Sequence, residues 1–199
     1  MVLRTLGAVA LGATTFHRQK PLLLLAYLSL EGPQARRYMA DLFYPETADP
    51  MNSLSRAVSH LRMIAAGVIE GDNTKVWTHT SCDASELLSL TDAKNYERAL
   101  ELYKGPFALD YALGLGTELE EWLYSTRESL AAKARSIFIA LGEQEAQKSN
   151  FSEAAQLAEK AYRLKEASLL EPDDFGRLYN LLHLGGSSLA TEVRKEAKS

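Results

Sequence analysis

Three segments within the first ninety residues carry apolar positions at helical spacing. The apolar run at residues 22–30 follows Pro21 and stops before Gly32-Pro33, and a proline in the first turn with a glycine after the last turn predicts a helix there. Because this segment is apolar on nearly every side, the helix is expected to lie buried within its domain. Further helices are predicted over residues 34–43 and 51–66.

Short β-prone runs accompany these helices. Residues 2–11 are apolar and interrupted by Gly7, which predicts one or two strands at the start of the chain. Val68-Ile69, a polar turn at residues 70–73 and a second run at residues 76–78 predict a β-hairpin. Three helices followed by a hairpin are typical of a winged helix-turn-helix, so a DNA-binding domain of this type is expected over residues 1–91.

The chain after Thr91 is predicted to be helical throughout. Capping-box spacings and a Gly-Gly turn mark the helix ends. The predicted helices are a brief one from Asp83 and those over residues 91–103, 117–149, 173–184 and 187–198. Small residues at 154, 158 and 161 fit a tetratricopeptide-like repeat, and they fit any tight helical hairpin equally well. The expected fold is therefore mainly α with small β, the second domain being an all-α, tetratricopeptide-like helical domain over residues 92–199, with Tyr103, Phe107 and Trp122 among its core anchors.

The polar face of the helix at residues 51–66 carries the main functional signal. The apolar residues on its other face are Leu54, Ala57, Val58 and Leu61. On a helical wheel the residues pointing away from them are Asn52, Arg56, Ser59 and Met63, with Ser55 and His60 beside them and Arg62 on the flank. Arginine can donate two hydrogen bonds to guanine, amide and hydroxyl groups can bind base edges or phosphate, and methionine can pack against a thymine methyl. This face therefore predicts contact with the major groove. The structural alternative is a solvated helix face with one ordinary arginine.

Three further cations are candidate DNA contacts. Arg36 and Arg37 precede the second helix, where a phosphate-positioning role and simple surface solubility are both open. Lys75 lies at the hairpin tip, where it could reach the minor groove, although Glu70 and Asp72 nearby would repel phosphate. The loop at residues 44–50 resembles by position the segment that related winged helices offer to RNA polymerase, and it also fits an ordinary acidic turn.

Composition and charge narrow the class of protein. With 199 residues and 46% hydrophobic composition the chain is long enough for two domains, and no apolar run approaches the roughly 18 residues of a membrane span, so a cytoplasmic protein without a membrane partner is expected. Residues 1–91 contain eight basic and eight acidic side chains, so the net charge of −4 belongs to the second half. A neutral first half can bind DNA when its cations gather on one face.

Catalytic chemistry has little support in the sequence. There is no phosphate-binding loop or His-Glu-x-x-His motif, and Gly114-Leu115-Gly116 lacks the third glycine of a dinucleotide site. The lone cysteine, Cys82, is expected to be a packing residue. The histidines are dispersed without ligand spacing, at positions 17, 60, 79 and 183. No enzyme, catalytic residue, cofactor or metal is therefore predicted.

Several segments, taken in order, resemble the streptomycete antibiotic regulatory protein type of bacterial transcriptional regulator. They are residues 3–7, Lys20 before the apolar helix, residues 54–62, Leu102-Tyr103-Lys104-Gly105-Pro106-Phe107, and Glu120-Glu121-Trp122-Leu123 with Arg127 and Leu130. The resemblance implies a winged helix joined to a bacterial transcriptional activator domain. It further implies a transcription activator that binds promoter double-stranded DNA, often at direct repeats, as a homo-oligomer on DNA, and that contacts RNA polymerase. The alternative is a protein-interaction adaptor whose winged helix no longer binds DNA.

Overall fold

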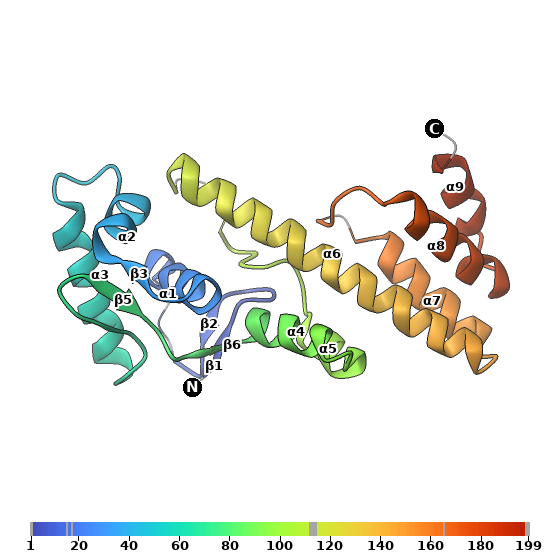
Figure 1. The fold of residues 1–199 in the computed structure, drawn as a ribbon, viewed down its shortest axis with the longest axis horizontal. Coiled ribbons are helices and arrows are strands. Elements are labelled where there is room, and N and C mark those ends of the chain that lie inside the picture. The colour runs from blue at the N-terminus through green and yellow to red at the C-terminus, as the bar shows by residue number, and fades with distance from the viewer. Residues whose placement is uncertain (1, 15, 17, 112–114, 165, 198–199) are drawn as a thin grey trace. The chain divides into compact units, whose positions relative to one another are not determined.

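The computed structural model describes residues 2–14, 16, 18–111, 115–164 and 166–197. His17 and Gly114, named above, lie outside these described residues. Over the described ranges the chain forms nine helices and six short strands (Figure 1). This content confirms the expectation of a mainly α fold with a small β component.

The helix ends agree well with the sequence pattern. The helices are α1 (Gln19–Glu31), α2 (Arg36–Phe43), α3 (Pro50–Ile64), α4 (Asp83–Asp92), α5 (Tyr96–Leu102), α6 (Thr117–Gln147), α7 (Phe151–Tyr162), α8 (Pro172–Leu184) and α9 (Leu189–Glu196). The strands are β1 (Val2–Arg4), β2 (Ala10–Leu11), β3 (Gln34–Ala35), β4 (Glu70–Gly71), β5 (Lys75–Trp77) and β6 (Ser81–Cys82). The predictions for α1, α3, α6, α8 and α9 are confirmed to within three residues at either end.

Two other helices begin further along the chain than predicted, by two residues in one case and by five in the other. The helix expected from residue 34 begins at Arg36, because Gln34 and Ala35 pair with β5 as strand β3. The helix expected from Thr91 begins at Tyr96, because Thr91 still belongs to α4 and the chain reverses after it. Lys94 supports this reversal with a positive φ of 56°. A strand pairing at Gln34 and a continuing helix followed by a turn at Thr91 thus override the local sequence pattern.

The chain divides into two compact units, each assembled from two segments. The first unit contains Met1–Leu87 and Leu102–Thr126, and the second contains Leu88–Glu101 and Arg127–Ser199. This division differs from the single boundary expected near residue 91.

Contacts of residues 102–126 explain the difference. The N–H of Ala108 donates to the carbonyl of Thr5 at 2.7 Å, and the ring of Trp122 lies 4.6 Å from that of Tyr27, centroid to centroid. Phe107 packs edge-on against Trp122 at 5.8 Å. Tyr103, Phe107 and Trp122 therefore belong to the first unit, where Phe107 is buried and the other two are half-buried, and the expectation that they anchor the helical domain was wrong.

Two small sheets belong to the first unit. Strand β1 lies between β2 and β6, antiparallel to β2 and parallel to β6. Strand β5 lies between β3 and β4 and is antiparallel to both. Helix α1 is buried from Pro21 to Leu28, as its uniform apolar pattern predicts. Gly32 ends α1 with a positive φ of 74° while its N–H donates to the carbonyl of Leu28.

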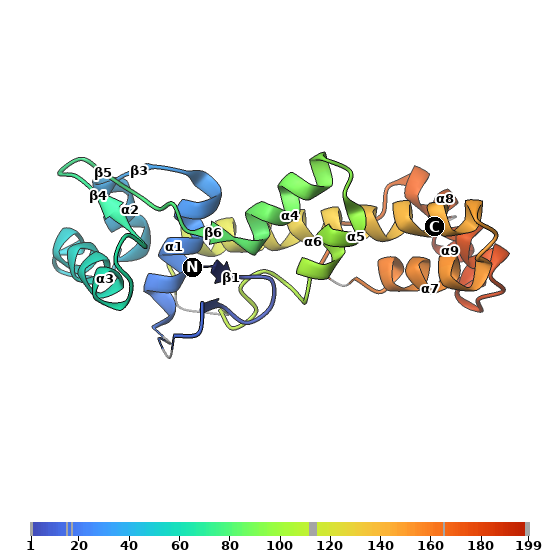
Figure 2. The same cartoon turned by 90° about the horizontal axis from the view of Figure 1, so that it is seen from below.

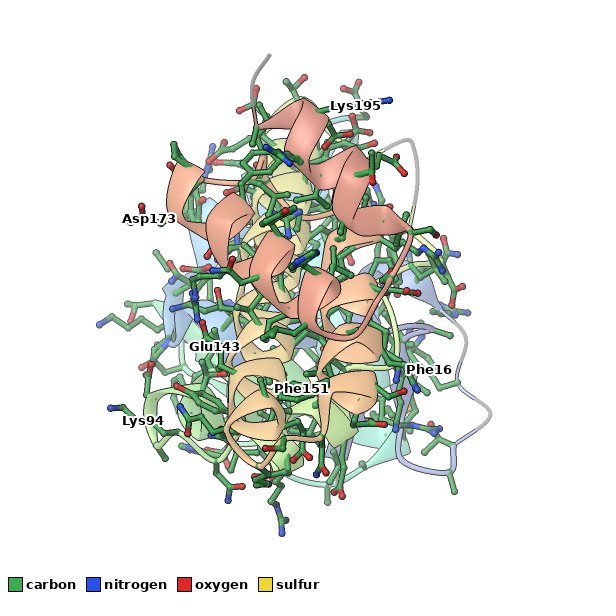
Figure 3. The ribbon with its side chains drawn as sticks, turned by 90° about the vertical axis from the view of Figure 1, so that its right-hand side faces the viewer. Phe16, Lys94, Glu143, Phe151, Asp173 and Lys195 are labelled. Atoms are coloured by element: carbon green, nitrogen blue, oxygen red, sulfur yellow. The ribbon has the colours of Figure 1, made fainter. Side chains whose placement is uncertain are left out.

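The second unit is built from helices in the part of the chain that the structure describes. Small residues let its helices approach closely: Ala154 and Ala158 of α7 are fully buried, and a Cβ on Gly142 of α6 would lie 3.0 Å from the Leu181 side chain of α8. Glu143, labelled in Figure 3, accepts hydrogen bonds at 2.7 and 2.8 Å from the guanidinium of Arg177. A shared apolar core thus joins α6, α7 and α8, and a forked ion pair links α6 to α8.

Candidate nucleic-acid interface

Helix α3 has a defined start and a defined buried side. The side chain of Asp49 accepts from the N–H of Asn52 at 2.9 Å, which caps the first turn, and Pro50 occupies a position where no N–H is needed. Its buried residues are Leu54, Ala57, Val58 and Leu61. With these four packed inward, the rotation of α3 about its axis is set, and so is the side that it turns to solvent.

The solvent side of α3 is formed by Asn52, Arg56, Ser59 and Met63, which we call the α3 face. All four residues are exposed, and Met63 retains 75% of its accessible surface. Among the described residues, the guanidinium of Arg56 has no hydrogen-bond or ion-pair partner. A free guanidinium and a large apolar side chain therefore stand together on one exposed helix face, at the positions that the helical wheel predicts. Their contact with DNA stays a prediction.

Ser55 and His60 border the α3 face on opposite sides, and each contacts an arginine from another element. The hydroxyl of Ser55 accepts from Arg36 Nη2 at 2.9 Å. On the other border, Arg18 Nη1 lies 3.0 Å from His60 Nδ1. Two arginines that are distant from α3 in the sequence are thereby held beside it. Ser55 and His60 are thus engaged within the chain rather than turned freely outward.

In the first unit, the hairpin of β4 and β5 lies beside α3 (Figure 2). Arg62 Nε donates to the carbonyl of Ile69 at 3.2 Å, which ties the end of α3 to the start of the hairpin. The predicted turn at residues 70–73 is shifted, because Glu70 and Gly71 belong to β4. The true turn forms around Asp72, whose carboxylate accepts from the N–H groups of Thr74 and Lys75 at 2.6 and 2.8 Å.

These hydrogen bonds define the charge at the hairpin tip. The backbone N–H groups of Lys75 and Thr74 lower the pKa of Asp72 to about 2, so the carboxylate stays ionised at neutral pH. The Lys75 side chain is exposed beside it. A cation and an anion therefore share the tip, which leaves the tip without a strong net charge.

Two other features predicted as contacts also have partners within the chain. Arg37, whose side chain is 80% exposed, forms an ion pair with Asp41 one helical turn away at 3.0 Å. In the loop at residues 44–50, Asp49 caps α3, and a Cβ on Gly116 would lie 3.0 Å from Pro45 Cγ. The 44–50 loop thus has a structural role at both of its ends, whatever else it contacts.

The remaining chemistry is sparse. Within the described ranges, no group of three or more His, Cys, Asp or Glu side chains is placed to hold a metal ion. Cys82 is buried, as expected, and burial raises the pKa of its thiol. No helix among the described residues combines the length and apolar character needed to cross a bilayer.

Comparison with known proteins gives no match: no family model fits the sequence, and no curated protein resembles it significantly. The candidate interface therefore depends on its own geometry. The sequence pattern predicted the exposed side of α3 and named Arg36 as a candidate contact, and it gave no sign that Arg18 lies beside α3. Nothing local marks Arg18, because its partner His60 is 42 residues away along the chain.

Proposed function

We propose that the chain is a sequence-specific DNA-binding transcription regulator whose first unit binds promoter DNA through α3. The observation that carries this proposal is the α3 face, where Arg56 is exposed and has no partner in the described part of the chain. An unpaired guanidinium at the centre of an otherwise uncharged face suits the bidentate acceptors of guanine. Exposed Met63 suits a thymine methyl, and Asn52 and Ser59 suit base edges or phosphate.

The order of elements in the first unit supports a winged helix-turn-helix. Helices α1, α2 and α3 are followed by the antiparallel pair β4 and β5, and β3 between α1 and α2 completes their sheet. In such domains the third helix enters the major groove and the hairpin is the wing. The resemblance to streptomycete antibiotic regulatory proteins supports the same assignment, and the activator role rests on that resemblance.

The second unit is proposed to contact protein rather than DNA. Its residues are close to neutral, with 13 basic and 14 acidic side chains over 88–101 and 127–199, so it lacks the cationic excess that favours binding to phosphate. Close packing of α7 on α6 and α8 through Gly142 and Ala154 supports a tetratricopeptide-like arrangement, which presents helical surfaces to partners. RNA polymerase and a second copy of the chain on an adjacent repeat are the partners that the resemblance implies.

The test is selection of bound fragments from a random duplex library by the full chain, followed by binding assays on the enriched sequence. Arg56→Glu should abolish binding, because it places a carboxylate against the groove. Arg4→Glu is the matched control: it makes the same charge change at an exposed arginine on β1 of the same unit, and it should weaken binding far less.

The outcomes separate two classes of protein. Enrichment of one motif, lost with Arg56→Glu and retained with Arg4→Glu, supports a DNA-binding regulator. Equal losses in both variants would indicate binding by net charge alone and would contradict sequence-specific contact through α3. No enrichment at low salt would refute the DNA-binding function and favour a protein-interaction adaptor.

A further inference from the structure

Arg18 is the one arginine beside α3 that local sequence gives no reason to select. It immediately precedes α1, its side chain is exposed, and its Nη1 atom lies 3.0 Å from Nδ1 of His60. A guanidinium only donates hydrogen bonds, so Nδ1 is the acceptor in this contact. An imidazole ring brings no negative charge, so His60 holds Arg18 without cancelling the charge of the guanidinium.

Arg36 is held in an equivalent way on the other border of the α3 face. Its Nη2 donates to the neutral hydroxyl of Ser55 at 2.9 Å, and its backbone N–H donates to the carbonyl of Thr74 at 2.8 Å. Among the described residues neither Arg18 nor Arg36 has a carboxylate partner, whereas Arg37 is paired with Asp41. Both borders of the face therefore retain a full positive charge.

The helical geometry places these two charges symmetrically. At about 100° per residue, Ser55 and His60 point about 70° to either side of the centre of the α3 face. A helix with its side chains is about 10–12 Å across and the major groove is about 12 Å wide, so a docked helix turns its two flanks toward the two phosphate backbones. Arg18 and Arg36, held on the two flanks of α3, would then lie close to the phosphates of the two strands.

We propose that Arg18 binds a backbone phosphate, that His60 positions it, and that Arg18 and Arg36 together hold the two strands that border the groove. The proposal rests on the proposed function, since it requires α3 to occupy the major groove. It changes the role of His60 from a base contact to a positioning residue. It also adds a phosphate contact to the set that the sequence suggests.

The experiment measures the dissociation constant of the full chain for its selected duplex over a series of salt concentrations. A phosphate contact contributes about one to the slope of log Kd against log salt, and it does so on any DNA sequence. Arg18→Ala should therefore weaken binding roughly tenfold at moderate salt, lower the slope by about one, and affect selected and unrelated duplexes equally. Arg36→Ala should do the same, and Arg4→Ala on β1 is the matched control.

Variants of His60 separate positioning from base contact. His60→Ala should weaken binding on selected and unrelated duplexes alike, because Arg18 loses its acceptor. His60→Gln keeps a side-chain oxygen that can accept from Arg18, and it should restore most of the affinity. Loss of discrimination between duplexes with His60→Ala would instead assign His60 to a base.

The failure of this proposal is distinct from failure of the proposed function. If Arg18→Ala has the same salt slope and affinity as Arg4→Ala while Arg56→Glu still abolishes binding, the proposed role of Arg18 is refuted and the proposed function stands. Absence of any duplex binding by the wild-type chain would overturn both. Circular dichroism of each variant should match the wild type, since Arg18 is exposed and makes no core contact.

Discussion

Asp83 offers the sharpest test of what holds the first unit together. Its carboxylate is buried, with 7% of the residue exposed, at the junction of β6 and α4. It accepts from the N–H of Thr5 at 2.7 Å, from the hydroxyl of Thr5 at 2.6 Å and from the N–H of Leu6 at 3.2 Å. These bonds join residues 77 or 78 positions apart, so Asp83 ties the start of the chain to the end of β6.

The loss of stability expected for Asp83→Ala follows from the buried donors that would have no acceptor. Asp83→Ala leaves the buried backbone N–H groups of Thr5, Leu6 and Ala84 without their acceptor. Each unsatisfied buried group costs about 1–3 kcal/mol, so a loss of about 3–9 kcal/mol in the free energy of unfolding is expected. Thr5→Val removes the hydroxyl bond to the carboxylate, together with the weaker contact of that hydroxyl with Cys82 Sγ, so it should cost about 1.5–3 kcal/mol. The double variant should lose less stability than the sum of the two single variants, because both substitutions remove the same bond between Thr5 and Asp83.

The assay can be confined to the first unit. Both tryptophans of the chain, Trp77 and Trp122, belong to that unit, so tryptophan fluorescence in urea follows its unfolding, while far-ultraviolet circular dichroism follows the helices of both units. Asp83→Ala should move the fluorescence transition to lower urea at unchanged slope. A loss below about 1 kcal/mol in a natively folded Asp83→Ala variant would refute the argument, since no single stranded donor would then cost its expected minimum.

Three further outcomes follow from the geometry. Gly185→Ala should destabilise the second unit by about 1–3 kcal/mol in thermal unfolding followed by circular dichroism, because the added Cβ would overlap the Ala155 side chain and the Phe151 carbonyl. Gly176→Ala, in α8 with open space around its Cβ position, should instead stabilise it by about 0.5–1 kcal/mol, and equal effects of the two substitutions would contradict this packing. The amides of the hairpin turn should lose their ordered chemical shifts as the pH falls from about 4 toward 2. The pKa of Asp72 is lowered, so the bonds that its carboxylate accepts are fully present above the usual carboxyl pKa and are lost as Asp72 is protonated. Asp72→Asn should remove that transition, and a midpoint near 4 in the wild-type chain would contradict the lowered pKa.

Local patterns predicted most helices because they act over a few residues. Pro21 and Gly32 bound α1, and its uniform apolar character leaves only a buried position. The period of apolar residues in α3 predicted which side is buried, and therefore which residues form the α3 face. Both features depend on spacing within one element, which is visible in the sequence.

Features that depend on distant partners were not accessible in this way. Gln34 and Ala35 form a strand only because β5 pairs with them 40 residues later. Residues 102–126 join the first unit because the carbonyl of Thr5 accepts from the N–H of Ala108 and the ring of Tyr27 packs against Trp122. The capping signal at Thr91 was outweighed by the continuation of α4, and the turn signal at residues 70–73 by the pairing of β4 with β5.

The candidate site divides along the same line. The sequence by itself determined the amphipathic α3 and its outward residues, because helical periodicity alone turns Arg56 to solvent once the apolar side is buried. Only the tertiary structure brought Arg18 to His60 and Arg36 to Ser55, and only it engaged Arg62 and Arg37 with partners of their own. The physical reason is that a long cationic side chain is placed by whichever acceptor the folded chain brings within hydrogen-bond distance, and that acceptor can lie anywhere along the sequence.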